Sequence, residues 1–208
     1  VKTIAIDKTE ADDIIAYLGS IIPEKPEDKI IIVSSDKDFL QLVNENVLVY
    51  RPIEKEYYNE DTIKEKFNIS PHNFIIYKTL LGDSSDKVKG IKGLGEKGLY
   101  KKFPEITEKD LTLDDIHSIC ESKFKDHLVY ARVIQNIEEL EKNYKIMDLS
   151  NPMLTDRDKE QLKTFVLSEK THYLPEQFLA MYKKDQLGSI IRNVEYWIGD
   201  VFSRFEQK

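Results

Sequence analysis

Three short acidic clusters follow one another along this 208-residue chain, and they constrain its fold more than any other feature. They read E-A-D-D at Glu10–Asp13, S-S-D-K-D at Ser34–Asp38 and G-D-S-S-D at Gly82–Asp86. Carboxylates at this density repel one another and destabilise a folded chain unless a cation gathers them. The fold is therefore expected to hold these clusters around positive charge, and divalent metal ions are its simplest source.

Apolar patterns in the first 58 residues predict an α/β sheet. Lys29–Ser34 is a compact β-branched run typical of a buried parallel strand, and Lys2–Asp7 and Val47–Arg51 are expected to be strands as well. Ala11–Ile21 has helical spacing, and a short helix is expected at Phe39–Val43. This alternation predicts an α/β fold with a mostly parallel central sheet.

Beyond residue 58 the pattern becomes largely helical. Helices are expected at Glu60–Phe67, Pro71–Leu81, Asp115–Lys123, Leu128–Asn143 and through much of Asp156–Phe205, with a brief return to the sheet at Tyr144–Leu149. We therefore divide the chain into a partial α/β domain with metal-binding carboxylates (1–58), a helical region (59–150) and a helical tail (151–208). The tail is expected to pack on the α/β core.

Each of the first two acidic clusters allows two interpretations. Glu10, Asp12 and Asp13 lie where a strand gives way to a helix, so they are metal ligands or simple caps stabilised by the helix dipole by roughly 0.3–1 kcal/mol. Asp36 and Asp38 follow the buried strand and point the same way from its carboxyl end, where α/β sheets bind ligands. A solvated turn containing two acids is the alternative for this pair.

The third cluster completes the pattern. Asp83 and Asp86, three residues apart, would share one face of a helix end or a tight turn, and a loop rich in Ser and Asp is the alternative. Taken together, the clusters favour a two-metal site, whose ions lie about 3.5–4 Å apart and are bridged by carboxylates. Oxygen ligands without His or Cys favour Mg²⁺ or Mn²⁺ over zinc.

A glycine- and lysine-rich segment, Lys87–Lys102, follows the third cluster directly. Its glycines have neither the preceding strand of a dinucleotide fold nor the Gly-Lys-Ser/Thr of a Walker loop. Glycines between two short helices let backbone N–H groups approach a phosphate closely, and lysines add a salt-dependent hold on a nucleic-acid backbone. A flexible solvated loop is the alternative, although Ile91 and Leu94 are spaced to pin the segment.

The overall charge hides this local reversal. A net charge of −7 weighs against nucleic-acid binding, but residues 87–102 carry six lysines against only Glu96. No apolar run approaches the roughly 20 residues that span a bilayer, so no membrane partner is expected. Cys120 is the single cysteine, which fits a protein of the reducing cytoplasm.

These motifs resemble those of the flap endonuclease and 5′-nuclease superfamily. E-A-D-D, then S-S-D-x-D after a buried strand, then G-D-x-x-D followed by G-I-x-G-L-G are the matching motifs, and the spacing is most similar to that of T-even phage ribonuclease H-type 5′→3′ exonucleases. The glycine segment resembles the helix–three-turn–helix DNA-binding motif of phage and bacterial 5′-nucleases. The resemblance implies a metal-dependent 5′→3′ exonuclease or flap endonuclease that hydrolyses phosphodiesters in DNA or RNA–DNA, at a primer or a 5′ flap. It would act during phage replication, and a phage protein of this kind would work in the cytoplasm of the host cell.

The resemblance also implies roles for individual residues. Two Mg²⁺ or Mn²⁺ ions would be held by Glu10, Asp12, Asp13, Asp36, Asp38, Asp83 and Asp86, among which Asp12, Asp13, Asp36 and Asp38 would be the catalytic set. Nucleic acid would be bound by Lys87, Lys89, Gly90, Lys92, Gly93, Gly95 and Lys97, with a monovalent cation such as K⁺ at the glycine turn. Implied partners are a duplex with a 5′ end or flap and a single-strand-binding protein or sliding clamp.

The chain departs from the family at its start. Residue 1 is Val, and the first strand with an essential Asp and the helical arch of the family have no counterpart. We therefore expect a C-terminal fragment, or one half of an enzyme whose other chain supplies the remainder, with an exposed hydrophobic sheet edge. A non-catalytic fragment that binds duplex DNA is the alternative function, and an RNA-cleaving PIN-like domain is disfavoured by the glycine segment.

Overall fold

A computed structural model describes residues 3–23, 25–84, 87–168, 174–188 and 190–202. The chain forms two compact units, which are considered separately below. One unit comprises residues 5–166, and the other combines residues 1–4 with residues 167–208. None of the helices in the described ranges is long and apolar enough to cross a membrane.

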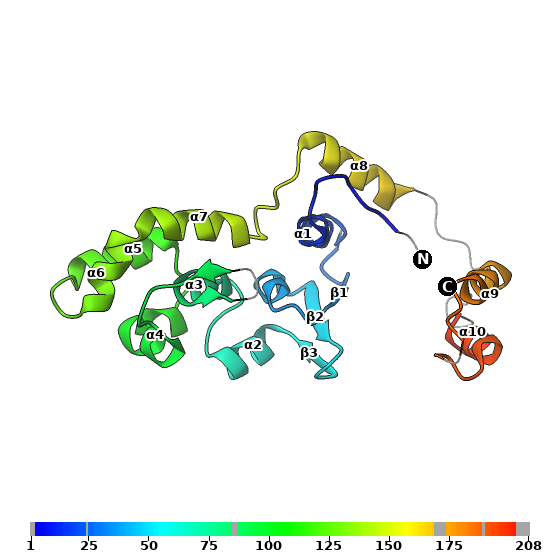
Figure 1. The fold of residues 1–208 in the computed structure, drawn as a ribbon, viewed down its shortest axis with the longest axis horizontal. Coiled ribbons are helices and arrows are strands. Elements are labelled where there is room, and N and C mark those ends of the chain that lie inside the picture. Colours follow the sequence, from blue (N-terminus) through cyan, green and yellow to red (C-terminus); the bar gives the residue numbers. More distant parts are fainter. Residues whose placement is uncertain (1–2, 24, 85–86, 169–173, 189, 203–208) are drawn as a thin grey trace. The chain divides into compact units, whose positions relative to one another are not determined.

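A three-stranded sheet lies in the larger unit (Figure 1). Strand β1 (Ile30–Val33) pairs in parallel with β2 (Val47–Arg51), and β2 pairs antiparallel with β3 (Glu56–Tyr58). Ile32 and its register partner Val49 are both buried. The apolar, β-branched composition of β1 and β2 accounts for this placement, because such residues pack well on a pleated, buried surface.

The sheet differs from the expected one in three respects. It has one parallel and one antiparallel pair, so a mostly parallel sheet is not confirmed. Thr3–Asp7 contains no strand, and Tyr144–Leu149 does not return to the sheet, because its first residues continue a helix. This helix is α7 (Ile137–Met147), in which Leu140, Asn143 and Met147 are buried at helical spacing. A short apolar run cannot by itself distinguish a buried helix end from a strand.

Helices make up most of the remaining structure, and several begin at side-chain caps. Asn59 accepts the Thr62 N–H at 2.8 Å, and Thr112 forms a capping box with Asp115. In chain order these elements are α1 (Ala11–Ile21), η1 (Asp38–Leu42), α2 (Glu60–Phe67), α3 (Asn73–Leu81), α4 (Glu96–Lys102), η2 (Pro104–Thr107), α5 (Leu113–Ser122), α6 (Leu128–Gln135), α7 (Ile137–Met147) and α8 (Asp156–Leu167). The helix expected over Leu128–Asn143 is thus two helices, which separate at Asn136.

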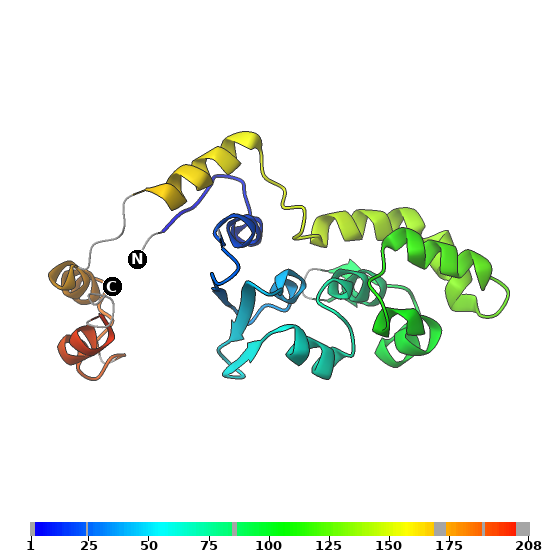
Figure 2. The same ribbon diagram turned by 180° about the vertical axis from the view of Figure 1, so that it is seen from behind.

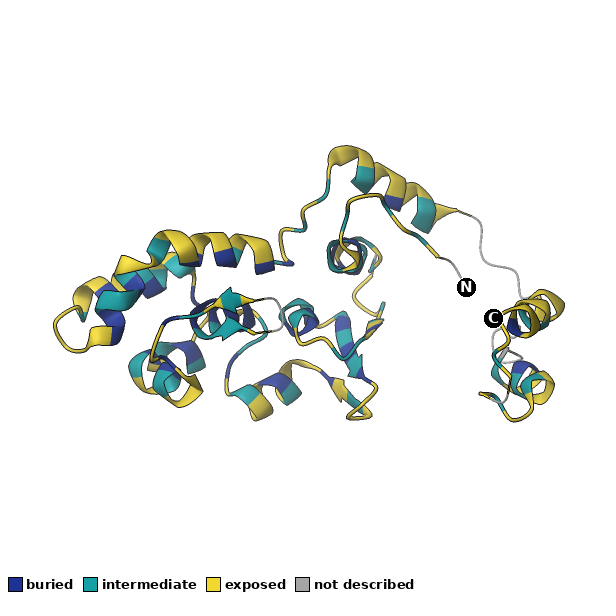
Figure 3. Cartoon of the chain, in the orientation of Figure 1, coloured by how far each residue is buried: buried dark blue, intermediate teal, exposed yellow. Residues whose placement is uncertain are grey.

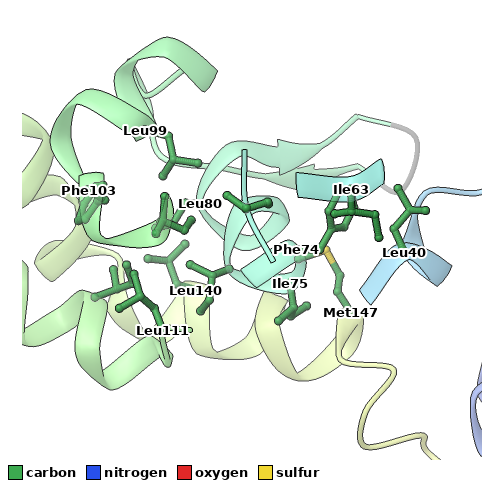
Figure 4. Packing of buried hydrophobic residues seen from close by; sticks show 14 of the residues in the cluster. Leu40, Ile63, Phe74, Ile75, Leu80, Leu99, Phe103, Leu111, Leu140 and Met147 are labelled. Carbon is green, nitrogen blue, oxygen red and sulfur yellow. The ribbon is translucent and has the colours of Figure 1, made fainter. Parts of the chain in front are cut away.

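Helix α3 lies at the centre of the core. It packs against η1, α4 and α7, and Figure 2 shows it between these elements from behind. Because neighbours surround it, α3 is buried nearly all round, as the burial colours of Figure 3 show. Phe74 and Leu80 from α3 meet Leu99 from α4 and Leu140 from α7 in one apolar cluster (Figure 4).

A two-stranded ribbon follows α3 directly. Its strands are β4 (Gly82–Asp83) and β5 (Val88–Lys89), and Gly82 is the register partner of Lys89. Asp83, an expected metal ligand, is therefore placed opposite Val88, at the entrance to the glycine segment. The acidic and the basic motifs are thus joined by a short piece of regular structure.

The smaller unit contains α9 (Pro175–Lys184) and α10 (Val194–Phe202). Phe178 of α9 stacks on Trp197 of α10 with ring centroids 5.8 Å apart. The buried Tyr182 accepts the Ile191 N–H at 2.9 Å and donates to the Gly188 carbonyl at 3.0 Å. The tail is helical as expected, and its packing on the α/β core stays a prediction.

Candidate functional site

The second and third acidic clusters meet at Lys78, a residue that sequence reasoning missed. Its ammonium donates to Asp83 Oδ2 at 2.8 Å and forms a second ion pair with Asp38. Asp38 opens η1, which follows β1 after the turn at residues 34–37. Lys78 lies near the end of α3, and Asp83 lies in β4. Two parts of the chain that are distant in sequence therefore meet here: the start of η1, and the adjoining α3 and β4. The available signal was a lysine within the otherwise apolar helix N-F-I-I-Y-K-T-L-L.

Lys78 is only 5% exposed, so its charge depends on these partners. Burial by itself lowers the pKa of Lys78, but the hydrogen bonds and charges of Asp38 and Asp83 outweigh burial, and the pKa is raised. The side chain is therefore a permanent ammonium that holds two carboxylates next to each other. Lys78 thus supplies one positive charge to the second and third clusters, and the divalent ions expected at the clusters stay a prediction.

Asp36 lies in the turn that joins β1 to this centre. Its Oδ1 accepts the Asp38 N–H at 2.9 Å, and its own N–H donates to Ser34 Oγ at 3.1 Å. These bonds form a side-chain turn of the kind that Asp favours, as in the alternative interpretation of this cluster. Asp36 is exposed, and its bond to the Asp38 N–H ties it to a member of the Lys78 centre.

The first acidic cluster begins α1. Glu10 occupies the N-cap position without a side-chain capping bond, so the helix dipole is the part of the capping interpretation that still applies to it. Asp13 Oδ1 accepts the Met153 N–H at 2.8 Å and so fixes the segment that precedes α8. Helix α1 packs on η1, which begins with Asp38. The first cluster therefore lies on an element that contacts the second.

The described residues do not form a complete metal site. Among them, no three Asp, Glu, His or Cys side chains are grouped so as to hold a metal ion. Asp86, an expected ligand, lies outside the described residues. The all-oxygen chemistry of Asp36, Asp38 and Asp83 nevertheless fits a hard divalent cation, and two of these carboxylates already flank a cationic group. The metal-ligand assignments stay predictions.

The glycine segment is pinned to the core rather than flexible. Ile91 and Leu94 are buried, and the Ile91 N–H donates to the Leu80 carbonyl at 2.8 Å. A Cβ at Gly90 would lie 2.1 Å from the Leu81 carbonyl carbon, so the backbone of this segment touches the end of α3 directly. The alternative of a flexible solvated loop is therefore wrong.

The lysines of this segment surround the pinned backbone. Lys87, Lys89, Lys92 and Lys97 are all exposed, so their ammonium groups can reach a nucleic-acid backbone. The turn itself requires glycine at Gly93, which has a φ of 82°. The segment therefore presents positive charge from a fixed framework, one strand away from Asp83.

Comparison with known proteins supports the same class. Residues 1–68 match the family model described as 5'-3' exonuclease, N-terminal resolvase-like domain. The 5'-3' exonuclease of Aquifex aeolicus (strain VF5) is 36% identical over 154 residues, which cover 74% of this chain and 50% of that protein. The chain thus spans about half the length of this relative.

Solved structures share the fold. A mutant of the T5 5'-exonuclease matches with a TM-score of 0.61 and 22% identity, covering 89% of this chain and 68% of that chain. The bacteriophage T5 flap endonuclease, in a pseudo-enzyme-product complex with DNA and metal ions, matches with a TM-score of 0.58 and 23% identity, covering 89% and 61%. The family model, the identity to the Aquifex protein and the shared fold agree, so this chain belongs to the 5'-3' exonuclease family.

Proposed function

We propose that this chain is part of a metal-dependent 5′→3′ exonuclease or flap endonuclease, which hydrolyses phosphodiesters in DNA or RNA–DNA. The substrate is a duplex with a 5′ end or a flap, such as a primer to be removed during phage replication. One observation carries the proposal. Asp83, one of the two carboxylates at Lys78, and Lys89 of the glycine segment lie on the two strands of the β4–β5 ribbon. A nucleic-acid backbone bound by the lysines would therefore pass beside the acids.

The proposed cofactor is a pair of Mg²⁺ or Mn²⁺ ions. Their ligands would come from Glu10, Asp12, Asp13, Asp36, Asp38, Asp83 and Asp86. When bound, such ions make water a stronger nucleophile and stabilise the charge on the attacking and leaving oxygens. The T5 flap endonuclease shares the fold, and its structure holds DNA and metal ions, which supports a metal-dependent reaction on nucleic acid.

The side chains of this protein would hold the carboxylates in place and bind the phosphates of the substrate. Lys78 fixes the rotamers of Asp38 and Asp83 and offsets part of their charge, which keeps the carboxylates in place before a substrate arrives. Lys89 and Lys92 bind phosphates, and the pinned glycine backbone, with a monovalent cation such as K⁺, sets their register. Family membership also supports replication proteins, such as a single-strand-binding protein or a sliding clamp, as partners.

The single cysteine supports a cytoplasmic location.

A second function, duplex binding without cleavage, is favoured by a different observation. The described residues hold no three-ligand metal group, and an ammonium already occupies the space between Asp38 and Asp83. A fragment of this kind would dock on duplex DNA through the glycine segment. The two functions differ in what they do to a labelled substrate.

The test is cleavage of a 5′-flap duplex by the whole chain in Mg²⁺, with binding to the same duplex measured in Ca²⁺. The proposal predicts shortened 5′-labelled products in Mg²⁺ and none after EDTA is added. Binding in Ca²⁺ without any cleavage in Mg²⁺ would instead establish the non-catalytic function. If the chain neither binds nor cleaves the duplex, both functions are contradicted.

A further inference from the structure

A cavity of about 480 Å³ lies beside the glycine segment, on the side that faces α6 and α7. One wall is the segment itself, with Lys89 and Lys92, and the other is formed by Arg132 and Asn136 at the end of α6 and Glu139 at the start of α7. We call these five residues and their cavity the Arg132 pocket. No residue of α6 or α7 belongs to the DNA-binding set inferred from the sequence.

The helices hold the segment by its carbonyl groups. Arg132 Nη1 donates to the Lys92 carbonyl at 2.6 Å, and Asn143 Nδ2 donates to the Lys89 carbonyl at 3.2 Å. Both carbonyl oxygens, which would repel an anion, are thus engaged by side-chain donors. The lysine side chains of the same two residues remain exposed.

Arg132 also fits closely against the turn. A Cβ at Gly93, where φ is 82°, would lie 2.8 Å from Arg132 Nη1. The glycine therefore permits the approach of the guanidinium as well as the turn. Since a guanidinium carries five N–H donors in a planar fork, the bond to Lys92 uses only one of them.

The charge of the pocket favours an anion. Lys89, Lys92 and Arg132 provide three positive charges, and Glu139 provides one negative charge. The net charge of the pocket is therefore positive, so it attracts an anionic phosphodiester, whose single negative charge offsets part of the excess. The planar fork of an arginine also suits phosphate oxygens. An uncharged or cationic ligand would leave the excess unbalanced.

We propose that the Arg132 pocket binds one phosphate of the nucleic-acid backbone, so that α6 extends the DNA-binding surface beyond the glycine segment. Arg132 has two roles in this arrangement: it contacts the phosphate and it braces the Gly93 turn. The inference rests on the proposed function, because it assigns a contact to the nucleic acid that this function requires.

The test measures binding of a 5′-flap DNA duplex to the whole chain in Ca²⁺, by fluorescence anisotropy, across about 50–200 mM salt. Arg132→Gln should weaken binding and reduce the magnitude of the salt slope by about one, the contribution of one phosphate contact. Arg132→Lys should retain the slope because it keeps the charge. Arg157→Gln, the same change at an exposed residue of α8, should leave binding unchanged.

A second pair of variants leaves the hydrogen bond from Arg132 to the Lys92 carbonyl intact, so its result does not depend on the structure of the Gly93 turn. Glu139→Gln removes the acid from the pocket and should tighten binding, by roughly two- to fivefold at low salt. Glu138→Gln is its matched control, because Glu138 is exposed on the same helix and does not line the cavity. Melting temperatures of all variants separate a binding effect from unfolding.

Two outcomes would overturn the inference. If the wild-type chain binds the duplex and the changes at Arg132 and Glu139 leave affinity and salt slope unchanged, the pocket makes no phosphate contact and the proposed function stands. If the wild-type chain binds no duplex, the proposed function fails together with the pocket.

Discussion

Replacing Gly90 with Ala is expected to dislodge the glycine segment from the core. A Cβ at this position would lie 2.1 Å from the carbonyl carbon and 2.2 Å from the carbonyl oxygen of Leu81, and 2.5 Å from the Gly82 nitrogen. All three atoms belong to the backbone, so no side-chain rotation relieves the overlap. The free energy of unfolding should fall by about 3 kcal/mol, the upper range for an overpacked site.

The same change should weaken duplex binding by about tenfold, equivalent to ~1.4 kcal/mol, because the lysines lose their common framework. Thermal unfolding and anisotropy titrations in Ca²⁺ measure the two effects. Gly98→Ala is the matched control: its Cβ would meet only Leu94 Cδ1 at 3.5 Å, and alanine favours the helix that Gly98 occupies. If Gly90→Ala behaves like Gly98→Ala, the close packing of the segment on α3 is wrong.

Replacing Lys78 with Met is expected to destabilise the candidate site strongly. Asp38 and Asp83 would then face each other without the ammonium that holds them, and both side chains are mostly buried. Removing one partner of a buried ion pair costs about 3–5 kcal/mol. Millimolar Mg²⁺ should restore part of the loss, since an ion that binds only the folded state stabilises it by about 2.7 kcal/mol at one hundred times its dissociation constant.

Melting temperatures with and without Mg²⁺ check this result. Lys66→Met is the control, because Lys66 pairs with Glu56 at 2.6 Å in an exposed position. Exposed ion pairs contribute little, so this variant should melt close to the wild type, without a Mg²⁺ response. A Lys78→Met protein that is as stable as Lys66→Met would show that Lys78 does not organise the acids.

The local structure of the chain could be predicted well where one sequence period dominates. Ala11–Ile21, Val47–Arg51 and Glu60–Phe67 have the bounds expected of them, because each has a clear helical or β-branched pattern. The strand β3 was not predicted because its three residues are too few to show an alternation of apolar and polar side chains. The break at Asn136 was missed because α6 and α7 continue a similar apolar spacing on either side.

The candidate site was predictable only in part. The acids and lysines were identified by type and spacing, but their convergence depends on tertiary contacts over long separations. Lys78 resembled an ordinary residue of an apolar helix, yet it joins Asp38, 40 residues earlier in the chain. Arg132 lies 40 residues beyond the carbonyl to which it donates, so no local motif links it to the glycine segment.

The acids beside Lys78 are proposed to hold a divalent cation. The most direct measurement is a calorimetric titration of Mg²⁺ into the wild-type chain and into Asp36→Asn. This variant loses a charge but keeps the Oδ1 acceptor for the Asp38 N–H, so the turn is preserved. Asp61→Asn, at an exposed position of α2, is the control.

We predict that the wild-type and Asp61→Asn chains bind Mg²⁺ equally, and that Asp36→Asn binds it at least ~10-fold more weakly, because loss of even an outer-shell partner costs about 10–100-fold. Equal Mg²⁺ affinity in all three chains, or no binding in the wild type, would contradict the claim.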